Sequence, residues 1–318
     1  MQRGKKILIA VICILIVVLG IQMHAGYQIY QNNCQRATNE RTSDEVLVDW
    51  LINDKNYDVE TFRASYQNEE IAIESSLGTH SIPATYIYAP SNTDKTGHTI
   101  IMVHGLLGNR ISNYPVAEMF LKQGYNVITY AQRSSGGNLA PHTTFGYLES
   151  QDLTDYIAYA DKQMASDGLL GVWGQSFGAA TVQNAMNEKI FEEAVDYVVL
   201  DCPMGDMADL MHDGSIWSKM KSAFANLFFK INLDFSYKDQ SVYPQIADTK
   251  IPVLIACSES DEAFPLQSVK RIYDGMKENE KELFIVEDSA HSDIYFDHPK
   301  EYTQTMEAFL EKHVEKNK

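Results

Sequence analysis

The chain has 318 residues, of which 45% are hydrophobic, and a formal net charge of −17. Its length and apolar content suffice for a full α/β core, and one catalytic domain with an appendage fits better than two small domains. The acidic balance argues against a nucleic-acid partner, because phosphate binding needs a basic face.

The first segment is basic and then apolar. Arg3, Lys5 and Lys6 precede Ile7–Ile21, which is uncharged and almost wholly aliphatic. Such a segment is either a cleaved signal peptide or an uncleaved membrane anchor. We favour an anchor over residues 1–26, because a cleavage site needs two small residues and Met23-His-Ala25 supplies only one of them.

The positive charges before the span also predict its orientation. They place the N-terminus in the cytoplasm and the catalytic domain outside, as a single-pass protein of the cell membrane.

Residues 27–68 are expected to form a polar stalk, over residues 27–42, and then a packing helix. Ser43 precedes two acidic residues and can cap a helix start. Apolar residues follow at helical spacing, at Val46, Leu47, Trp50 and Leu51. The pattern predicts an amphipathic helix that packs on the body in a structural role.

Residues 69–318 alternate between strand and helix signals. Strands are predicted at 70–74, 84–88, 98–103, 126–130, 169–173, 195–200, 252–256 and 282–286, and helices at 113–123, 147–166, 179–189, 266–277 and 299–314. After a first hairpin this order predicts a mostly parallel eight-stranded sheet with helices on both faces, an α/β fold.

A Gly-x-Ser-x-Gly pattern joins one strand to the next helix. Residues 172–178 read Val-Trp-Gly-Gln-Ser-Phe-Gly. This is the pattern of a nucleophile elbow, in which Gly174 and Gly178 make room for a tight turn. Ser176 is therefore the candidate nucleophile, although the pattern alone is equally compatible with a packing turn.

An acid and a histidine follow at the ends of later strands. Asp261 lies beyond the predicted strand 252–256 and four residues before Pro265, and is the candidate orienting acid. His291 follows the last predicted strand and is the candidate base. The chain order Ser, Asp, His is the order of α/β-hydrolases. The competing acids are Glu259, Glu262 and Asp201, and the competing histidines, which we interpret as surface residues, are His142, His212 and His298.

With the elbow, the segments His104–Asn109, Ser260–Pro265 and Ala290–Ser292 resemble the α/β-hydrolase superfamily over about residues 69–314. In particular the chain resembles bacterial membrane-anchored serine hydrolases of the serine aminopeptidase and feruloyl-type esterase branch. It departs from them after the fourth strand, where relatives often carry Asp-x-Arg-Gly and this chain reads Ala-Gln-Arg-Ser at residues 131–134, without the acid. That exchange calls the usual packing of this loop into question.

The resemblance implies an oxyanion hole made by two backbone N–H groups, those of Leu106 and Phe177. His104 is expected to support the loop rather than to take part in chemistry. No His or Cys pair has metal-ligand spacing and no phosphate-binding loop is present, so neither a metal nor a cofactor is expected.

The interval from about 203 to 250 is too long for one crossover and is expected to hold a small helical cap. Ser215 can cap a helix there, whose apolar stripe comprises Ile216, Met220, Phe224, Leu227, Phe228 and Ile231. Three interpretations stay open. The helix packs on the sheet, it roofs the acyl pocket as a lid, or Lys219, Lys221 and Lys230 bring it to an anionic membrane face.

These observations favour a serine hydrolase that cleaves a carboxylic ester or related acyl bond through an acyl-enzyme intermediate, carboxylesterase-like. One alternative is a serine peptidase for short peptides, in which Glu259, Glu262 or Asp206 holds a free terminus. Another is a hydrolase-like binding protein without turnover. The expected partners are a small acyl substrate or a short peptide, and a membrane through the N-terminal helix.

Overall fold

The computed structural model describes residues 2–33, 40–91, 94–95, 97–164, 168–211, 214–277 and 280–314. Its centre is one eight-stranded sheet with the strand order β1-β2-β4-β3-β5-β6-β7-β8. Strand β2 pairs antiparallel with both β1 and β4, and every other pair of neighbours is parallel. The strands are β1 (Asn68–Glu74), β2 (Ser81–Ile87), β3 (Thr99–Val103), β4 (Asn126–Tyr130), β5 (Leu170–Gln175), β6 (Tyr197–Asp201), β7 (Val253–Ser258) and β8 (Lys281–Val286). The predicted fold class, a mostly parallel sheet of eight strands, is confirmed.

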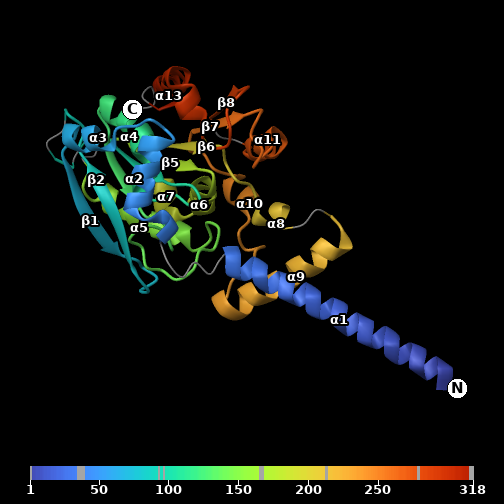
Figure 1. The fold of residues 1–318 in the computed structure, drawn as a ribbon. Helices are drawn as coiled ribbons and strands as arrows, with labels where there is room; N and C mark the ends of the chain where they lie inside the picture. The colour runs from blue at the N-terminus through green and yellow to red at the C-terminus, as the bar shows by residue number, and fades with distance from the viewer. Residues whose placement is uncertain are drawn as a thin grey trace.

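Helices cover both faces of this sheet (Figure 1). Successive strand residues point to opposite faces, so Met102 joins one core while Ile101 and Val103 join the other. The first face is covered by α2 (Asp44–Asn53), α3 (Val59–Ser65), α4 (Tyr114–Lys122) and α13 (Pro299–His313), and the second by α5 (Glu149–Asp161), α6 (Phe177–Ala185), α7 (Lys189–Ala194), α10 (Val242–Ile246) and α11 (Leu266–Gly275).

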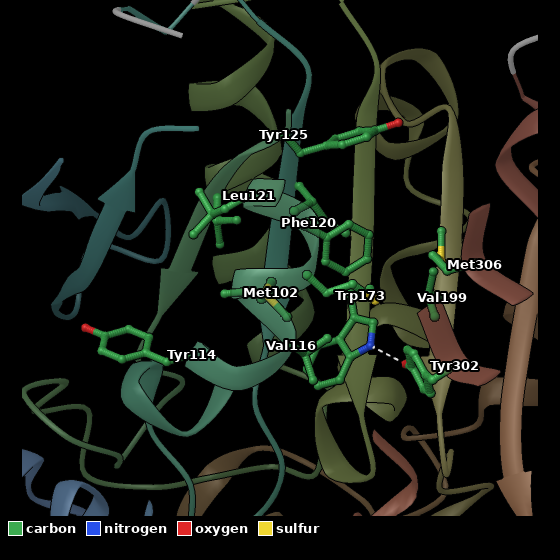
Figure 2. Close-up of a cluster of buried hydrophobic side chains, with 14 of the residues drawn as sticks. Met102, Tyr114, Val116, Phe120, Leu121, Tyr125, Trp173, Val199, Tyr302 and Met306 are labelled. Carbon is green, nitrogen blue, oxygen red and sulfur yellow. Dashed lines mark hydrogen bonds between the residues drawn. The ribbon is translucent and has the colours of Figure 1, made fainter. Parts of the chain in front are cut away.

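The core of the first face is built around Trp173, on the strand that leads to Ser176. Figure 2 shows its indole among the side chains of Met102, Phe120 and Tyr302. The indole nitrogen of Trp173 donates a hydrogen bond of 2.8 Å to the Tyr302 hydroxyl, so α13 is tied to the centre of the sheet.

The cap interval contains α8 (Met207–Leu210), α9 (Ile216–Leu233) and α10. As expected, Ser215 caps α9, because its hydroxyl accepts a hydrogen bond of 3.1 Å from the Ser218 amide. The side that α9 buries differs from the predicted stripe: it consists of Ser218, Ser222, Ala225 and Phe229.

The N-terminal helix α1 (Gln2–Asn33) projects from the body, and only its C-terminal part lies beside α9 (Figure 1). Its stretch Arg3–Asn32 is long and apolar enough to cross a membrane. The helix continues through residues 27–33, the first part of the predicted stalk, because Tyr27 and Tyr30 pack against Phe228 of the cap. Residues 34–39 of the stalk lie outside the described residues.

Three shorter elements complete the chain: the 3-10 turns η1 (Glu40–Thr42) and η2 (Arg110–Asn113), and α12 (Ile294–Asp297) before α13. The single helix expected at 179–189 is instead the two helices α6 and α7.

Candidate active site

Ser176 occupies a strained turn between β5 and α6. Its φ and ψ angles are 55° and −115°, a combination that L-residues seldom adopt. The flanking glycines allow it. A Cβ on Gly178 would overlap the carbonyl oxygen of Val103, and one on Gly174 would lie 2.7 Å from a Val182 methyl carbon and 2.8 Å from the Gly178 oxygen. The turn therefore needs glycine at both positions for close packing of the helix on the sheet.

The structure brings Ser176, His291 and Asp261 into one hydrogen-bonded chain. Ser176 Oγ lies 2.7 Å from His291 Nε2, and His291 Nδ1 lies 2.7 Å from Asp261 Oδ2. A carboxylate only accepts hydrogen bonds, so Nδ1 carries the proton and Nε2 is free to accept from the serine hydroxyl. This is the tautomer that a general base needs.

Asp261 is held as a carboxylate. Its Oδ1 accepts hydrogen bonds from the amides of Ala263 at 2.8 Å and Phe264 at 2.9 Å. Burial acts to raise its pKa, but the hydrogen bonds from His291 and these two amides outweigh burial and lower the pKa below its usual value. The Phe264 ring also packs edge-on against the His291 imidazole, at 5.1 Å between centroids.

The competing acids have other surroundings. Glu259 and Glu262 are exposed, and Asp206 accepts hydrogen bonds from the Ser241 hydroxyl and the Val242 amide at the start of α10. Asp201 ends β6 and is fully buried.

The two competing histidines that the structure describes have other partners than Ser176. His298 pairs with Asp288, and the backbone oxygen of His142 accepts a hydrogen bond from Arg133. His212 lies outside the described residues.

The loop after β3, which carries Leu106, lies against the elbow. A Cβ on Gly105 would be 3.5 Å from the Gln175 oxygen and 3.6 Å from Ser176 Cβ. His104 supports this loop: its Nδ1 donates to the Gly105 oxygen and its Nε2 accepts from the Gln132 amide. Burial lowers the pKa of His104 to about 4, so the ring stays neutral.

Gln132, in the loop after β4, bonds to two neighbouring elements. Its side-chain nitrogen donates to the His104 oxygen at 2.6 Å, and its side-chain oxygen accepts from the Thr181 hydroxyl at 2.6 Å. An amide that donates on one side and accepts on the other thus links the loop after β3 to α6, which a carboxylate could not do with both of these partners.

A cavity of about 550 Å³ opens beside Ser176 and His291. One wall is the helix α2, and the rest comes mainly from the loops after β3 and β7. Its apolar lining consists of Val46, Leu47, Trp50, Leu106, Leu107 and Phe264, and Arg41 adds a positive charge. Among the described residues that line it, none belongs to α9. The sequence pattern of α2 indicated only a structural role, so its place at the cavity was missed.

Polar contacts fasten α2 to the loop after β3. The Asn109 side chain donates to the Thr42 oxygen at 2.9 Å and to Asp44 Oδ1 at 3.0 Å. Arg110 donates to Asp44 Oδ2 at 2.8 Å. These bonds therefore join the cavity wall to the loop with Leu106.

Asp201 lies behind Ser176, and the sequence suggested it only as a rival acid to Asp261. Its backbone oxygen accepts from the Ser176 amide at 2.8 Å, and its Oδ2 accepts from the Tyr302 hydroxyl at 2.9 Å. Burial raises the pKa of Asp201 to about 6, against the lowering effect of the Tyr302 hydrogen bond. No signal in the sequence links Asp201, Tyr302 and Trp173, because they are far apart along the chain.

Cys202, Asp261 and His291 form a group of possible metal ligands in the described part of the chain. Two members already bind each other, and burial raises the pKa of the Cys202 thiol well above its usual value. A protonated thiol is a poor ligand, so these residues fit a proton-transfer site better than a metal centre.

Comparisons with known proteins agree with the geometry. Residues 98–235 match the family model of the alpha/beta hydrolase fold. The uncharacterized protein YqkD of Bacillus subtilis is 26% identical over 314 residues, which cover 96% of this chain and 97% of YqkD.

Solved structures share the fold. The Pyrococcus furiosus esterase Pf2001 aligns with a TM-score of 0.62 and 22% identity, over 81% of this chain and 97% of the esterase. The esterase EaEST from Exiguobacterium antarcticum aligns with a TM-score of 0.56 and 16% identity, over 77% of this chain and 100% of the esterase. The Pyrococcus horikoshii acylaminoacyl peptidase aligns with a TM-score of 0.58 and 16% identity, over 84% of this chain and 44% of the peptidase.

The membrane-anchored branch to which the sequence was compared stays a prediction. The strand order, the turn at Ser176 and these matches together show that the chain has the alpha/beta hydrolase fold.

Proposed function

We propose that the protein is a serine hydrolase that cleaves a carboxylic ester or related acyl bond. The observation that carries the proposal is the hydrogen-bonded chain from Ser176 through His291 to Asp261, which opens into an apolar cavity. In this mechanism Ser176 Oγ attacks the carbonyl carbon while His291 takes its proton. The amides of Leu106 and Phe177 stabilise the oxyanion.

The second half of the reaction reuses the same groups. His291 gives its proton to the leaving group as the acyl-oxygen bond breaks, and an acyl-Ser176 ester remains. Water then attacks this ester, His291 takes the water's proton, and the serine hydroxyl is restored. Asp261 stabilises the imidazolium at each step.

The cavity favours an ester over a peptide with a free amino terminus. A peptidase of that kind needs a fixed negative charge to hold the terminus. Glu259 and Glu262 are exposed and do not line the cavity, and Asp206 is engaged at the start of α10. Arg41 instead offers a positive charge at the rim. The acylaminoacyl peptidase among the structural relatives keeps peptide hydrolysis as the second candidate.

We also propose that α1 anchors the protein in the cell membrane with the catalytic domain outside. The support is the length and apolar character of Arg3–Asn32 and the three basic residues at its start. Protease added to intact spheroplasts should digest the domain or release it. Cleavage only after lysis would reverse the orientation.

The nucleophile is tested with a fluorophosphonate probe. Ser176→Ala should abolish labelling and lower turnover by about 10⁶, because the attacking oxygen is gone. Ser65→Ala is the control: it removes an exposed hydroxyl from α3, which does not line the cavity, and should keep both labelling and turnover. Equal labelling of Ser176→Ala and the parent would contradict the assignment and favour a binding protein.

The substrate class is tested by comparing turnover of nitrophenyl acyl esters with that of aminoacyl anilides. Faster turnover of the esters supports the proposal, and the reverse order supports the peptidase. If α2 forms the acyl wall, Trp50→Ala should change the preference among acyl chain lengths, with a discrimination of about 1–3 kcal/mol for each apolar group removed from the wall.

The test of α2 as the acyl wall has a matched control on α9. Trp217→Ala also removes an indole, but from a helix that does not line the cavity, and should leave chain-length preference unchanged. A change in preference with Trp217→Ala alone would restore the lid interpretation of α9.

A further inference from the structure

The outward surface of α9 is apolar although the helix belongs to an acidic protein. Four large side chains on it are strongly exposed: Ile216 at 65%, Trp217 at 55%, Leu227 at 47% and Ile231 at 69%. We call these four residues the outer stripe. At 100° per residue they gather within about one third of the helix circumference. The buried side, which consists of Ser218, Ser222, Ala225 and Phe229, is roughly opposite.

The outer stripe lies next to α1, which crosses α9 in close contact. A Cβ on Gly26 would lie 2.6 Å from Phe224 Cβ and 2.7 Å from the Ala225 amide nitrogen. The Tyr27 ring packs edge-on against Phe228 at 5.2 Å between centroids. Figure 1 shows the two helices crossing near the C-terminal end of α1. The apolar surface of α1 is therefore continuous with the outer stripe.

The crossing point has a defined depth if α1 spans a bilayer. The apolar part of α1 begins at Ile7, after the last basic residue, Lys6. The 19 helical steps from Ile7 to Gly26 rise about 28 Å at 1.5 Å per residue. The hydrocarbon core of a bilayer is about 30 Å thick. Gly26, and with it α9, is thus placed at the level where the span leaves the hydrocarbon.

The charges and aromatic residues on α9 suit that level. The helix contains Lys219, Lys221 and Lys230 and no acidic residue, in a chain with a net charge of −17. Lys219 and Lys230 lie together along one edge of the outer stripe, and α1 packs beyond its other edge. Tryptophan favours the boundary between headgroups and acyl chains, and exposed lysines there attract anionic headgroups.

We propose that α9 is a membrane-surface helix. Its outer stripe lies in the headgroup-acyl boundary of the leaflet at which α1 emerges, and its lysines contact anionic lipid headgroups. The inference rests on the proposed span of α1 but not on the catalytic residues. It selects the third of the three interpretations that the sequence left open for this helix.

Trp217 provides the test, with the full-length protein reconstituted in vesicles. The vesicles contain phosphatidylcholine and phosphatidylglycerol, with and without bromine on the acyl chains near the headgroup. The signal of Trp217 is the difference between the parent and Trp217→Phe, which retains Trp50 and Trp173 as internal controls. Brominated lipid should quench the Trp217 signal at least twofold, and aqueous iodide should quench it little.

Other outcomes overturn the proposal. Quenching by iodide and not by bromine would place the outer stripe in water. Protection from both quenchers would mean that protein, such as a second copy of the chain, covers it. Resistance to alkaline extraction reports separately on the span of α1, so a failure of the anchor and a failure of α9 are distinguishable.

The lysines are tested in the same assay. Replacing Lys219, Lys221 and Lys230 by Gln should reduce bromine quenching in vesicles with phosphatidylglycerol to the level seen in pure phosphatidylcholine. Lys238→Gln, just beyond the helix, is the matched control and should have no effect. If bromine quenching were undiminished in the triple variant, the proposed contact between these lysines and anionic headgroups would be wrong.

Discussion

Two aspartates stand at the ends of neighbouring strands, and their surroundings give them opposite chemistry. Asp261, beyond β7, accepts three hydrogen bonds, from His291 and two backbone amides, and its pKa is lowered. Asp201, at the end of β6, is fully buried, accepts a hydrogen bond from Tyr302, and has a pKa raised to about 6. Burial raises the pKa of Asp201, hydrogen-bond donors lower the pKa of Asp261, and Asp261 is the one that is hydrogen-bonded to His291.

Of the substitutions that test this comparison, the largest effect is expected at Asp261. Asp261→Asn should lower turnover by roughly 10⁴, because an amide can donate to His291 Nδ1 and so favours the tautomer that cannot accept from Ser176. Esterase assays near neutral pH measure it. The exposed neighbour provides the control, since Glu259→Gln should leave turnover nearly unchanged. A damaging Glu259→Gln would reverse the assignment of the acid.

Asp201 should affect stability rather than turnover. Its folded pKa of about 6 exceeds the unfolded value of about 4, so the folded state holds a proton that the unfolded state has lost between these pH values. Stability therefore falls as pH rises from about 4 to about 6, by on the order of 2 to 3 kcal/mol, and stays lower above it.

Asp201→Asn removes that titration. Its melting temperature should exceed that of the parent at pH 7.5, and the two should converge as the pH falls towards 4. The exposed Glu262→Gln is the control and should show no such pH-dependent difference. An offset between Asp201→Asn and the parent that is constant over this range would disprove the raised pKa.

The smallest effect is expected at Tyr302, whose hydroxyl is hydrogen-bonded to both Trp173 and Asp201. Tyr302→Phe leaves the Trp173 indole nitrogen and Asp201 Oδ2 without their hydroxyl partner. It should cost about 1–2 kcal/mol of stability in a denaturant titration. It should also raise the pKa of Asp201 further, so the loss should be larger at pH 8 than at pH 5. Tyr295→Phe is a control on the same face, since its ring packs edge-on against Tyr302 without a bond to Asp201. An equal loss in the two variants would contradict a specific role for the Tyr302 hydroxyl.

The sequence predicted the sheet because most of its parallel strands are short, continuous runs of apolar residues, the pattern typical of buried strands. The residues Ser176, Asp261 and His291 could be selected for the same reason, since each follows such a run. Their roles as catalytic groups stay a proposal.

The surroundings of the helices could not be predicted in this way. Helical spacing at Val46, Leu47 and Trp50 indicates an apolar face but not that it faces a cavity. The stripe from Ile216 to Ile231 has the same spacing, but much of it is exposed on the surface of α9. The side that α9 buries consists of Ser218, Ser222, Ala225 and Phe229. Periodicity reports that a face is apolar. It carries no information about what will cover that face.

The fastening of α2 to the body limits how far the cavity can be from the end of α1. Arg41 lines the cavity, and Asn33 is the last residue of α1. Eight peptide steps separate them, and a fully extended chain spans at most about 30 Å over that length. If the proposed hydrolase is anchored through α1, it would meet its substrates within a thin layer along the membrane. Acyl compounds that partition into lipid are concentrated in that layer, and the tether would favour them over equally reactive compounds that stay in solution.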